Sequence, residues 1–256
     1  MSLCRSKYVQ SDMSGVLPEV KDLLDSGKQV IFSGTPCQIE TLRSFLKRDY
    51  VNLITCELFC YGTPEKKVYD QYLNYLENRY ASKIVSINFK DKRYGWDYYT
   101  TCVRFENRRE HCVFGGDSYS RLMRLWYSLM PGCLQCKRSL RSSKADFVLG
   151  DFYAYAKYIK ESPPKNGISC VVVNSEKGMA LIDGSKELEL LEIDMVSFFE
   201  QESERVRNFD LNERARFREK LSGCGYEEAC REVGLEDRPS SLRKNVLALR
   251  RRISRK

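Results

Sequence analysis

The stretch QVIFSGTPCQIETLRSFL, residues 29–46, predicts a short apolar strand, a tight turn and an amphipathic helix in immediate succession. Thr35 suits the N-cap of the helix, a proline follows at the first helical position, and Gln38 stands three residues after the cap. The pattern then recurs, because NLITCELF at 52–59 predicts a second strand and a second Gly-Thr-Pro turn at 62–64 precedes another helix. This order indicates a parallel β-α-β-α unit with both turns at the carboxyl edge of one sheet.

The remaining segments predict a different kind of structure. Alternating apolar and polar residues between 83 and 116 predict an antiparallel β-meander, and residues 145–153 and 168–173 predict two further strands. DSYSRLMRLWYSLM, residues 117–130, predicts a helix. Its expected inward side chains are Leu122, Leu125, Trp126 and Leu129.

We therefore expect a mixed α/β fold that combines a parallel β-α-β-α unit, an antiparallel β-meander and a helical, basic C-terminus. The change to charged, helical sequence near residue 195 predicts an α/β domain at 1–195 and a helical region at 196–256. The length of 256 residues is ample for a buried core.

Composition and charge limit the classes of function. The 42% hydrophobic and 30% charged residues are typical of a globular domain. There is no apolar run long enough for a membrane span and no leader-like start, so the expected location is the cytoplasm. The last 14 residues hold seven of the basic side chains, which leaves the other 242 residues with a net charge of +1. A nucleic-acid groove is therefore not expected, while the tail suits either a solvated, partly helical end or peripheral contact with an acidic partner or membrane surface.

Cysteine usage points to metal or redox chemistry. The eleven cysteines are odd in number and widely scattered, which argues against a disulfide framework in a reducing compartment. Cys56, Cys102, Cys112 and Cys170 lie in predicted strands, where we expect small buried thiols. His111 is the single histidine, which excludes Cys2His2 zinc sites and leaves mainly thiolate ligands.

Four cysteines stand in more reactive positions. Cys133 and Cys136 form a C-x-x-C after a Pro-Gly break and before basic residues. Cys37 lies in the first turn of a capped helix, where the helix dipole favours a thiolate, and Cys60 precedes the second Gly-Thr-Pro turn. Four such thiolates fit zinc or a 4Fe-4S cluster, and spacing alone leaves both open, although ligands from three distant segments favour iron and sulfur. Covalent catalysis by Cys37 is disfavoured because no histidine neighbours it in the sequence.

Five segments carry a resemblance to a known family. They are VIFSGTPCQIETLRSFL, ITCELFCYGTPEKKVYDQYL, INFKDKRYGWDYY, PGCLQCKRSLRSSKADFVLGDFY and ISCVVVNSEKG. Their order and spacing resemble the C-terminal domain of the coenzyme F420 hydrogenase/dehydrogenase beta-subunit family, over residues from about Ser6 to about Ala248.

The resemblance implies an electron-transfer oxidoreductase that binds a 4Fe-4S cluster and FAD. By motif position, the implied cluster ligands are Cys37, Cys60, Cys133 and Cys136. The implied flavin contacts are Ser6, Lys7 and Gln10 in the segment RSKYVQS, with Lys90, Lys92 and Arg93 as candidates for its phosphates. The implied partner is a ferredoxin-like donor or a separate N-terminal chain, and a homo-oligomer is compatible with the same role.

The chain also departs from the family pattern. The ferredoxin-like region with which relatives usually begin is absent, so we expect a fragment, a split gene product or an engineered truncation. Tyr61 stands where many relatives have histidine, and Tyr153 stands where tryptophan is common. These departures leave an alternative function, a noncatalytic zinc-binding or interaction module linked to surface-polysaccharide biosynthesis. The sequence identifies no catalytic residue.

Overall fold

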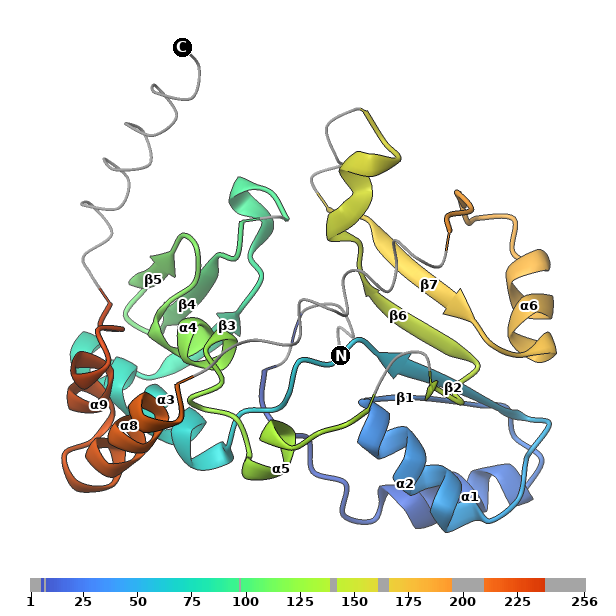
Figure 1. Ribbon diagram of the computed structural model, residues 1–256, viewed down its shortest axis with the longest axis horizontal. Coiled ribbons are helices and arrows are strands. Elements are labelled where there is room, and N and C mark those ends of the chain that lie inside the picture. Colours follow the sequence, from blue (N-terminus) through green and yellow to red (C-terminus); the bar gives the residue numbers. More distant parts are fainter. Residues whose placement is uncertain are drawn as a thin grey trace. The chain divides into compact units, whose positions relative to one another are not determined.

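The structure is a computed structural model that describes residues 6, 8–96, 98–138, 142–160, 166–194 and 210–237 (Figure 1). The chain forms two compact units. Unit 1 comprises Met1–Gln10, Gly62–Gln135 and Asn208–Lys256, and unit 2 comprises Ser11–Tyr61 and Cys136–Arg207. The domain boundary predicted at 195–196 and the basic tail, residues 243–256, lie outside the described residues.

Unit 2 is built on a four-stranded sheet in the order β1-β2-β6-β7. Its strands are β1 (Val30–Gly34), β2 (Leu53–Leu58), β6 (Phe147–Asp151) and β7 (Ser169–Val173). The first three run parallel, and β7 pairs antiparallel with β6. The predicted strand-turn-helix order of the first segment is thereby confirmed, since α2 (Pro36–Leu46) connects β1 to β2.

Helices α1 (Val16–Asp25) and α2 lie together along β1 and β2 in Figure 1. Their apolar stripes are buried against the strands because hydrophobic residues recur at helical spacing. The core residues are Val20, Leu24, Phe32, Ile39, Leu42, Leu46, Tyr50, Leu53 and Ala145. The short 3-10 helix η3 (Tyr153–Lys157) follows β6, and α6 (Glu176–Asp183) follows β7.

Unit 1 contains the predicted β-meander, with strands in the order β3-β4-β5. The strands β3 (Ile84–Asn88), β4 (Thr101–Phe105) and β5 (Glu110–Val113) pair antiparallel. The helices are α3 (Lys66–Tyr80), η1 (Lys92–Tyr94), α4 (Ser118–Arg124), α5 (Pro131–Leu134), α8 (Leu211–Gly223) and α9 (Tyr226–Glu232). Tyr72, Tyr119 and Phe217 are fully buried in the shared core.

Helix α3 does not continue the parallel unit as the repeated turn suggested. Its buried side chains Val68, Tyr72 and Leu76 pack into the core of unit 1. The second Gly-Thr-Pro turn belongs to the same unit, where Pro64 forms an isolated antiparallel bridge with Leu129. The parallel sheet therefore gains its third strand, β6, only after the chain has completed most of unit 1.

The helix predicted over 117–130 is shorter than expected. It ends at Arg124, because Trp126 adopts a left-handed backbone conformation with φ of 66°. Leu125 is consequently exposed, whereas Tyr127 and Leu129 are buried. The predicted inward orientation of Leu125 was wrong, and Tyr127 takes the buried position.

Among the residues that the structure describes, every helix is too short or too polar to span a lipid bilayer.

Candidate functional site

Cys37 lies in the first turn of α2, and the turn is held in the predicted capping arrangement. The backbone N–H of Thr35 donates to the Gln38 side chain at 2.9 Å, and the Thr35 hydroxyl lies 3.1 Å from the sulfur of Cys37. The Cys37 side chain is exposed. The sulfur of Cys37 therefore lies beside the N-cap hydroxyl at the start of α2.

Cys60 follows the carboxyl end of β2. The N–H of Phe59 still donates to the carbonyl of Leu149 at 2.8 Å, so the β2–β6 pairing holds the backbone up to the residue before the cysteine. The rings of Phe59 and Tyr61, on either side of Cys60, lie 5.0 Å apart. Cys60 is half-buried and is not part of a disulfide.

Cys133 lies in α5 of unit 1 and contacts the second Gly-Thr-Pro turn. The N–H of Thr63 donates to the sulfur of Cys133 at 3.4 Å. The turn is fixed in place by the N–H of Met130, which donates to the carbonyl of Thr63 at 2.9 Å. Gly62 has a φ of 107°, and a Cβ atom there would lie 3.4 Å from the Cβ of Cys133. Gly62 and Thr63, two and three residues after Cys60 in the chain, are therefore in contact with Cys133.

Cys136 is exposed and belongs to unit 2. Two residues further on, Arg138 forms an ion pair with Glu40 of α2. Glu40 is three residues after Cys37, which places the two on the same face of α2. Arg43 of the same helix donates to the carbonyl of Lys144 at 2.5 Å, so the segment after the C-x-x-C is anchored to α2 at two points.

Two cysteines form a disulfide that was not expected from the sequence. Cys102 and Cys112 are directly opposite in the β4–β5 pair, with Cα atoms 4.2 Å apart, and are disulfide-bonded. The prediction that they are separate buried thiols was wrong, because a directly opposed antiparallel pair brings two side chains within bonding reach. Cys170 is buried as expected. Cys230 is buried as well, and burial raises the pKa of its thiol to about 12. Cys4 lies outside the described residues.

The residues near the N-terminus that are proposed to contact flavin differ in their surroundings. Ser6 lines an open groove of about 360 Å³ in unit 1, whose walls come from α3, β3 and the segment around Val9. Gln10 is exposed, and Lys7 lies outside the described residues.

The basic residues in and next to η1 make contacts within unit 1. The Arg93 guanidinium lies 2.8 Å from an Asp91 carboxylate oxygen and 3.2 Å from a Glu110 oxygen. Lys90 lies over the Tyr99 ring at 5.6 Å, and Lys92 belongs to η1. A phosphate at Arg93 would have to displace two carboxylates.

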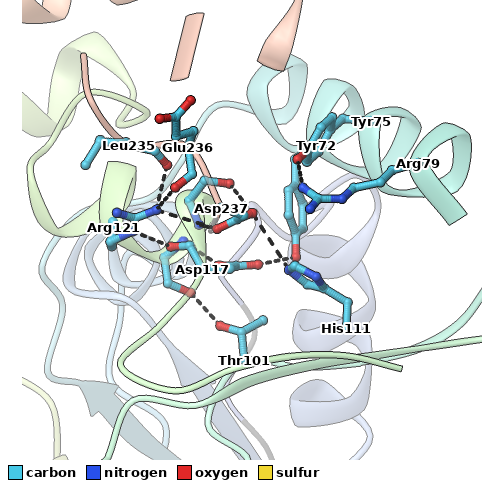
Figure 2. A network of polar contacts seen from close by, with 12 residues as sticks. Tyr72, Tyr75, Arg79, Thr101, His111, Asp117, Arg121, Leu235, Glu236 and Asp237 are labelled. Atoms are coloured by element: carbon cyan, nitrogen blue, oxygen red, sulfur yellow. Dashed lines mark hydrogen bonds and ion pairs between the residues drawn. The ribbon is translucent and has the colours of Figure 1, made fainter. Parts of the chain in front are cut away.

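Sequence reasoning missed a buried polar cluster in unit 1, which Figure 2 shows. His111 on β5, Asp117 before α4 and Asp237 after α9 are all buried. Burial, reinforced by the neighbouring Asp117 carboxylate, raises the pKa of Asp237. The sequence carries a weak signal for the first two residues, a single histidine in a strand and an N-cap aspartate, but none that links them to position 237.

Comparison with known proteins gives one family. The family model that describes the C terminus of the beta subunit of coenzyme F420 hydrogenase/dehydrogenase matches residues 27–197, more than half of the chain. No curated protein matches. Among solved structures, the chain is similar to one from the F420-reducing [NiFe] hydrogenase complex of Methanosarcina barkeri, studied by xenon derivatization, at 18% identity and a TM-score of 0.44, with 86% of this chain and 71% of that chain covered. That structural likeness is too weak to carry weight, and the family match stands without it. The chain belongs to the coenzyme F420 hydrogenase/dehydrogenase beta-subunit family, whose C-terminal part it contains.

Proposed function

We propose that this chain is an electron-transfer module that holds a 4Fe-4S cluster through Cys37, Cys60, Cys133 and Cys136. Membership of a redox family supports an oxidoreductase role. The supporting observation is a set of links between the segments that carry the four cysteines. Two links are contacts within a single unit, and the others are short separations along the chain.

In unit 2, the ion pair between Arg138 and Glu40 brings the segment after Cys136 to the helix that begins at Cys37. In unit 1, the Thr63 N–H bond to the sulfur of Cys133 brings the segment after Cys60 to the C-x-x-C.

Chain connectivity joins these two neighbourhoods. Cys60 is two residues from Gly62, so their Cα atoms are at most about 7.6 Å apart, and Cys133 and Cys136 are three residues apart.

The donor set suits the proposed group. All four side chains are exposed or half-buried and outside any disulfide, so their sulfurs are accessible to iron. The Thr63 N–H and the Thr35 hydroxyl lie against two of the sulfurs. Hydrogen bonds to ligand sulfurs raise the reduction potential of iron-sulfur sites. When bound, the cluster would supply one-electron transfer.

We further propose that FAD is the second redox group and that a ferredoxin-like chain is the electron donor. Ser6 of the implied flavin segment lines the open groove of unit 1, which supports a flavin contact there. Arg93 is the weakest of the implied phosphate contacts, because Asp91 and Glu110 already neutralise it. A reducing, cytoplasmic location would keep the four ligand thiols reduced.

Anaerobic reconstitution with iron and sulfide tests the cluster. The wild-type chain should bind about four sulfide and at least about four iron per chain. Cys133→Ser should lose most of both, whereas Cys224→Ser, at an exposed cysteine that ends α8, should retain them. Equal iron and sulfide in the two variants would refute the ligand assignment. Zinc without iron in protein purified under anaerobic conditions would favour the noncatalytic module instead, and an absorption spectrum of the same sample reports any bound flavin.

A further inference from the structure

Three buried side chains of unit 1 direct metal-ligand atoms toward one another (Figure 2). A ring nitrogen of His111 and carboxylate oxygens of Asp117 and Asp237 all lie within 4.8 Å of one another. The three residues are 5%, 0% and 8% exposed. This is the one group of its kind among the residues that the structure describes.

His111 presents a buried nitrogen that lacks a hydrogen-bond partner in the described part of the chain. Its Nδ1 atom lies 3.0 Å from the Tyr80 hydroxyl, which fixes the ring. Its Nε2 atom is buried, makes no hydrogen bond and lies 3.7 Å from Oδ2 of Asp237. That separation exceeds the length of a charge-assisted hydrogen bond, about 2.7–2.9 Å. An imidazolium proton shared directly with Asp237 therefore does not account for the geometry.

The two carboxylates are oriented by their own hydrogen bonds. Asp117 accepts from the Tyr72 hydroxyl and from the backbone N–H of Ser120. Asp237 accepts from the backbone N–H of Ser118 at 2.6 Å and from its hydroxyl at 2.9 Å. Hydrogen bonds of this kind hold ligating carboxylates in place at metal sites, as the Tyr80 contact does for the imidazole.

One cationic side chain lies beside the cluster. The Nη2 atom of Arg121 lies 3.5 Å from a carboxylate oxygen of Asp237. The same nitrogen donates to the carbonyls of Leu235 and Glu236 at 2.6 and 2.8 Å, so its hydrogen bonds are used mainly on backbone oxygens. The two buried carboxylates therefore rely little on Arg121, and a bound cation would pair with them directly.

We propose that His111, Asp117 and Asp237 bind a divalent transition-metal ion of the zinc or manganese class. Imidazole nitrogen and carboxylate oxygen are ligands that both ions accept. With metal–ligand bonds of about 2.1 Å, the 3.7 Å between His111 Nε2 and Asp237 Oδ2 corresponds to a ligand–metal–ligand angle of roughly 124°. The ion would tie the segment after α9 to β5 and to the start of α4, as a structural cross-link within unit 1.

Manganese is the sharper probe, because it prefers oxygen and nitrogen ligands to the thiolates of the proposed cluster. Chelator-treated wild-type chain should bind one equivalent of Mn²⁺, and at a hundredfold excess over Kd its folding equilibrium constant should rise about a hundredfold. Asp237→Asn should lose this binding and this stabilisation. Glu236→Gln, the same chemical change at the adjacent side chain, should keep both, as should Cys133→Ser.

Metal content by elemental analysis and thermal unfolding give the two readouts. Wild-type chain that binds neither Mn²⁺ nor Zn²⁺ stoichiometrically outside its cysteines would overturn the proposal, whether or not the variants fold. Equal Mn²⁺ binding by Asp237→Asn and Glu236→Gln would overturn it as well. Loss of all metal in Cys133→Ser would assign the ion to the thiolates and would equally refute this site.

Discussion

Replacement of Gly62 by alanine would test how the turn after Cys60 is held against Cys133. A Cβ atom on Gly62 would lie 2.5 Å from Cδ1 of Leu129, a side chain that is completely buried. The backbone cannot retreat easily, because Thr63 accepts from Met130 and the N–H of Glu65 donates to the carbonyl of Ser128 at 2.8 Å. The new methyl group therefore meets packed side chains on a pinned turn.

The expected loss of stability has two components. The φ of 107° at Gly62 is strained for any residue with a Cβ atom, at a cost of about 1–3 kcal/mol. Overpacking against Leu129 adds about 1–3 kcal/mol. Gly115→Ala is the matched control, since Gly115 also has a positive φ, of 77°, but no heavy atom lies within 4 Å of its Cβ position. Gly62→Ala should therefore destabilise unit 1 by about 1–3 kcal/mol more than Gly115→Ala does.

Urea unfolding followed by tryptophan fluorescence is a suitable assay, because Trp96 and Trp126 are the two tryptophans and both belong to unit 1. Leu129→Ala should restore part of the stability lost in Gly62→Ala, with a coupling of about 1–3 kcal/mol in a double-mutant cycle. Equal losses for the two glycine variants, or additive effects of the Gly62 and Leu129 changes, would refute the steric explanation. Gly62→Ala should also bind less iron after reconstitution, because it moves the Thr63 N–H away from Cys133.

Two further changes probe other parts of the chain. Burial opposes ionisation of Asp146, but hydrogen bonds from Ser175 and Thr55 outweigh it and lower the pKa of Asp146. Its stabilising effect is thus present above the unfolded pKa of about 3.9 and is lost as the pH falls through the folded value. Asp146→Asn should lower the free energy of unfolding by about 1–3 kcal/mol at neutral pH and should weaken this dependence on acid pH. Hydrogen exchange of peptides from β2 and β6 measures both effects, and unchanged exchange would contradict the prediction. The Cys102–Cys112 disulfide closes a loop with a sequence separation of 10. Its reduction should lower the free energy of unfolding by about 2–3 kcal/mol. A Cys102→Ala/Cys112→Ala variant should show the same stability with and without reductant.

Local signals in the sequence were sufficient to predict the start of α2 in unit 2, which carries the candidate ligand Cys37. The start of α2 depends on Thr35, Pro36 and Gln38, which are neighbours in the chain, and the structure has the predicted N-cap and the Thr35–Gln38 hydrogen bond. The capping interactions involve residues at most three apart, so no tertiary information is needed to recognise them.

The partners of α3 and of Cys102 could not be predicted in the same way. An amphipathic stripe such as Val68, Tyr72 and Leu76 shows that a helix face is buried but does not identify the sheet that buries it. Alternation in 101–113 likewise predicts two strands, while the register that sets Cys102 opposite Cys112 depends on the turn between them. The end of α4 at Arg124 follows from the backbone of Trp126, which no helix-breaking residue announces.

The buried polar cluster shows the same limit over a longer range. Asp237 meets Ser118 and His111 only because α8 and α9 pack into the core of unit 1 through Phe217, Leu221 and Tyr226. A side chain more than 110 positions away in sequence carries no periodic or spacing signal for such a contact. Candidate sulfur ligands are easier to recognise, since cysteines are conspicuous in a sequence whatever their spacing.

The two proposed metal sites can be separated in one experiment because their ligands differ. Reconstitution offers Fe²⁺ to both, and iron is also accepted by imidazole and carboxylate ligands, so total iron should exceed four per chain, about five to four sulfide. Inorganic sulfide counts the cluster alone, because nitrogen and oxygen ligands retain none. Asp237→Asn should then bring iron down to the sulfide value, and Cys133→Ser should leave about one iron with little sulfide. A Cys133→Ser chain that keeps sulfide would refute the assignment of the cluster to these cysteines. An Asp237→Asn chain with unchanged iron would exclude iron binding at the His111 site. Each result therefore tests one site independently of the other.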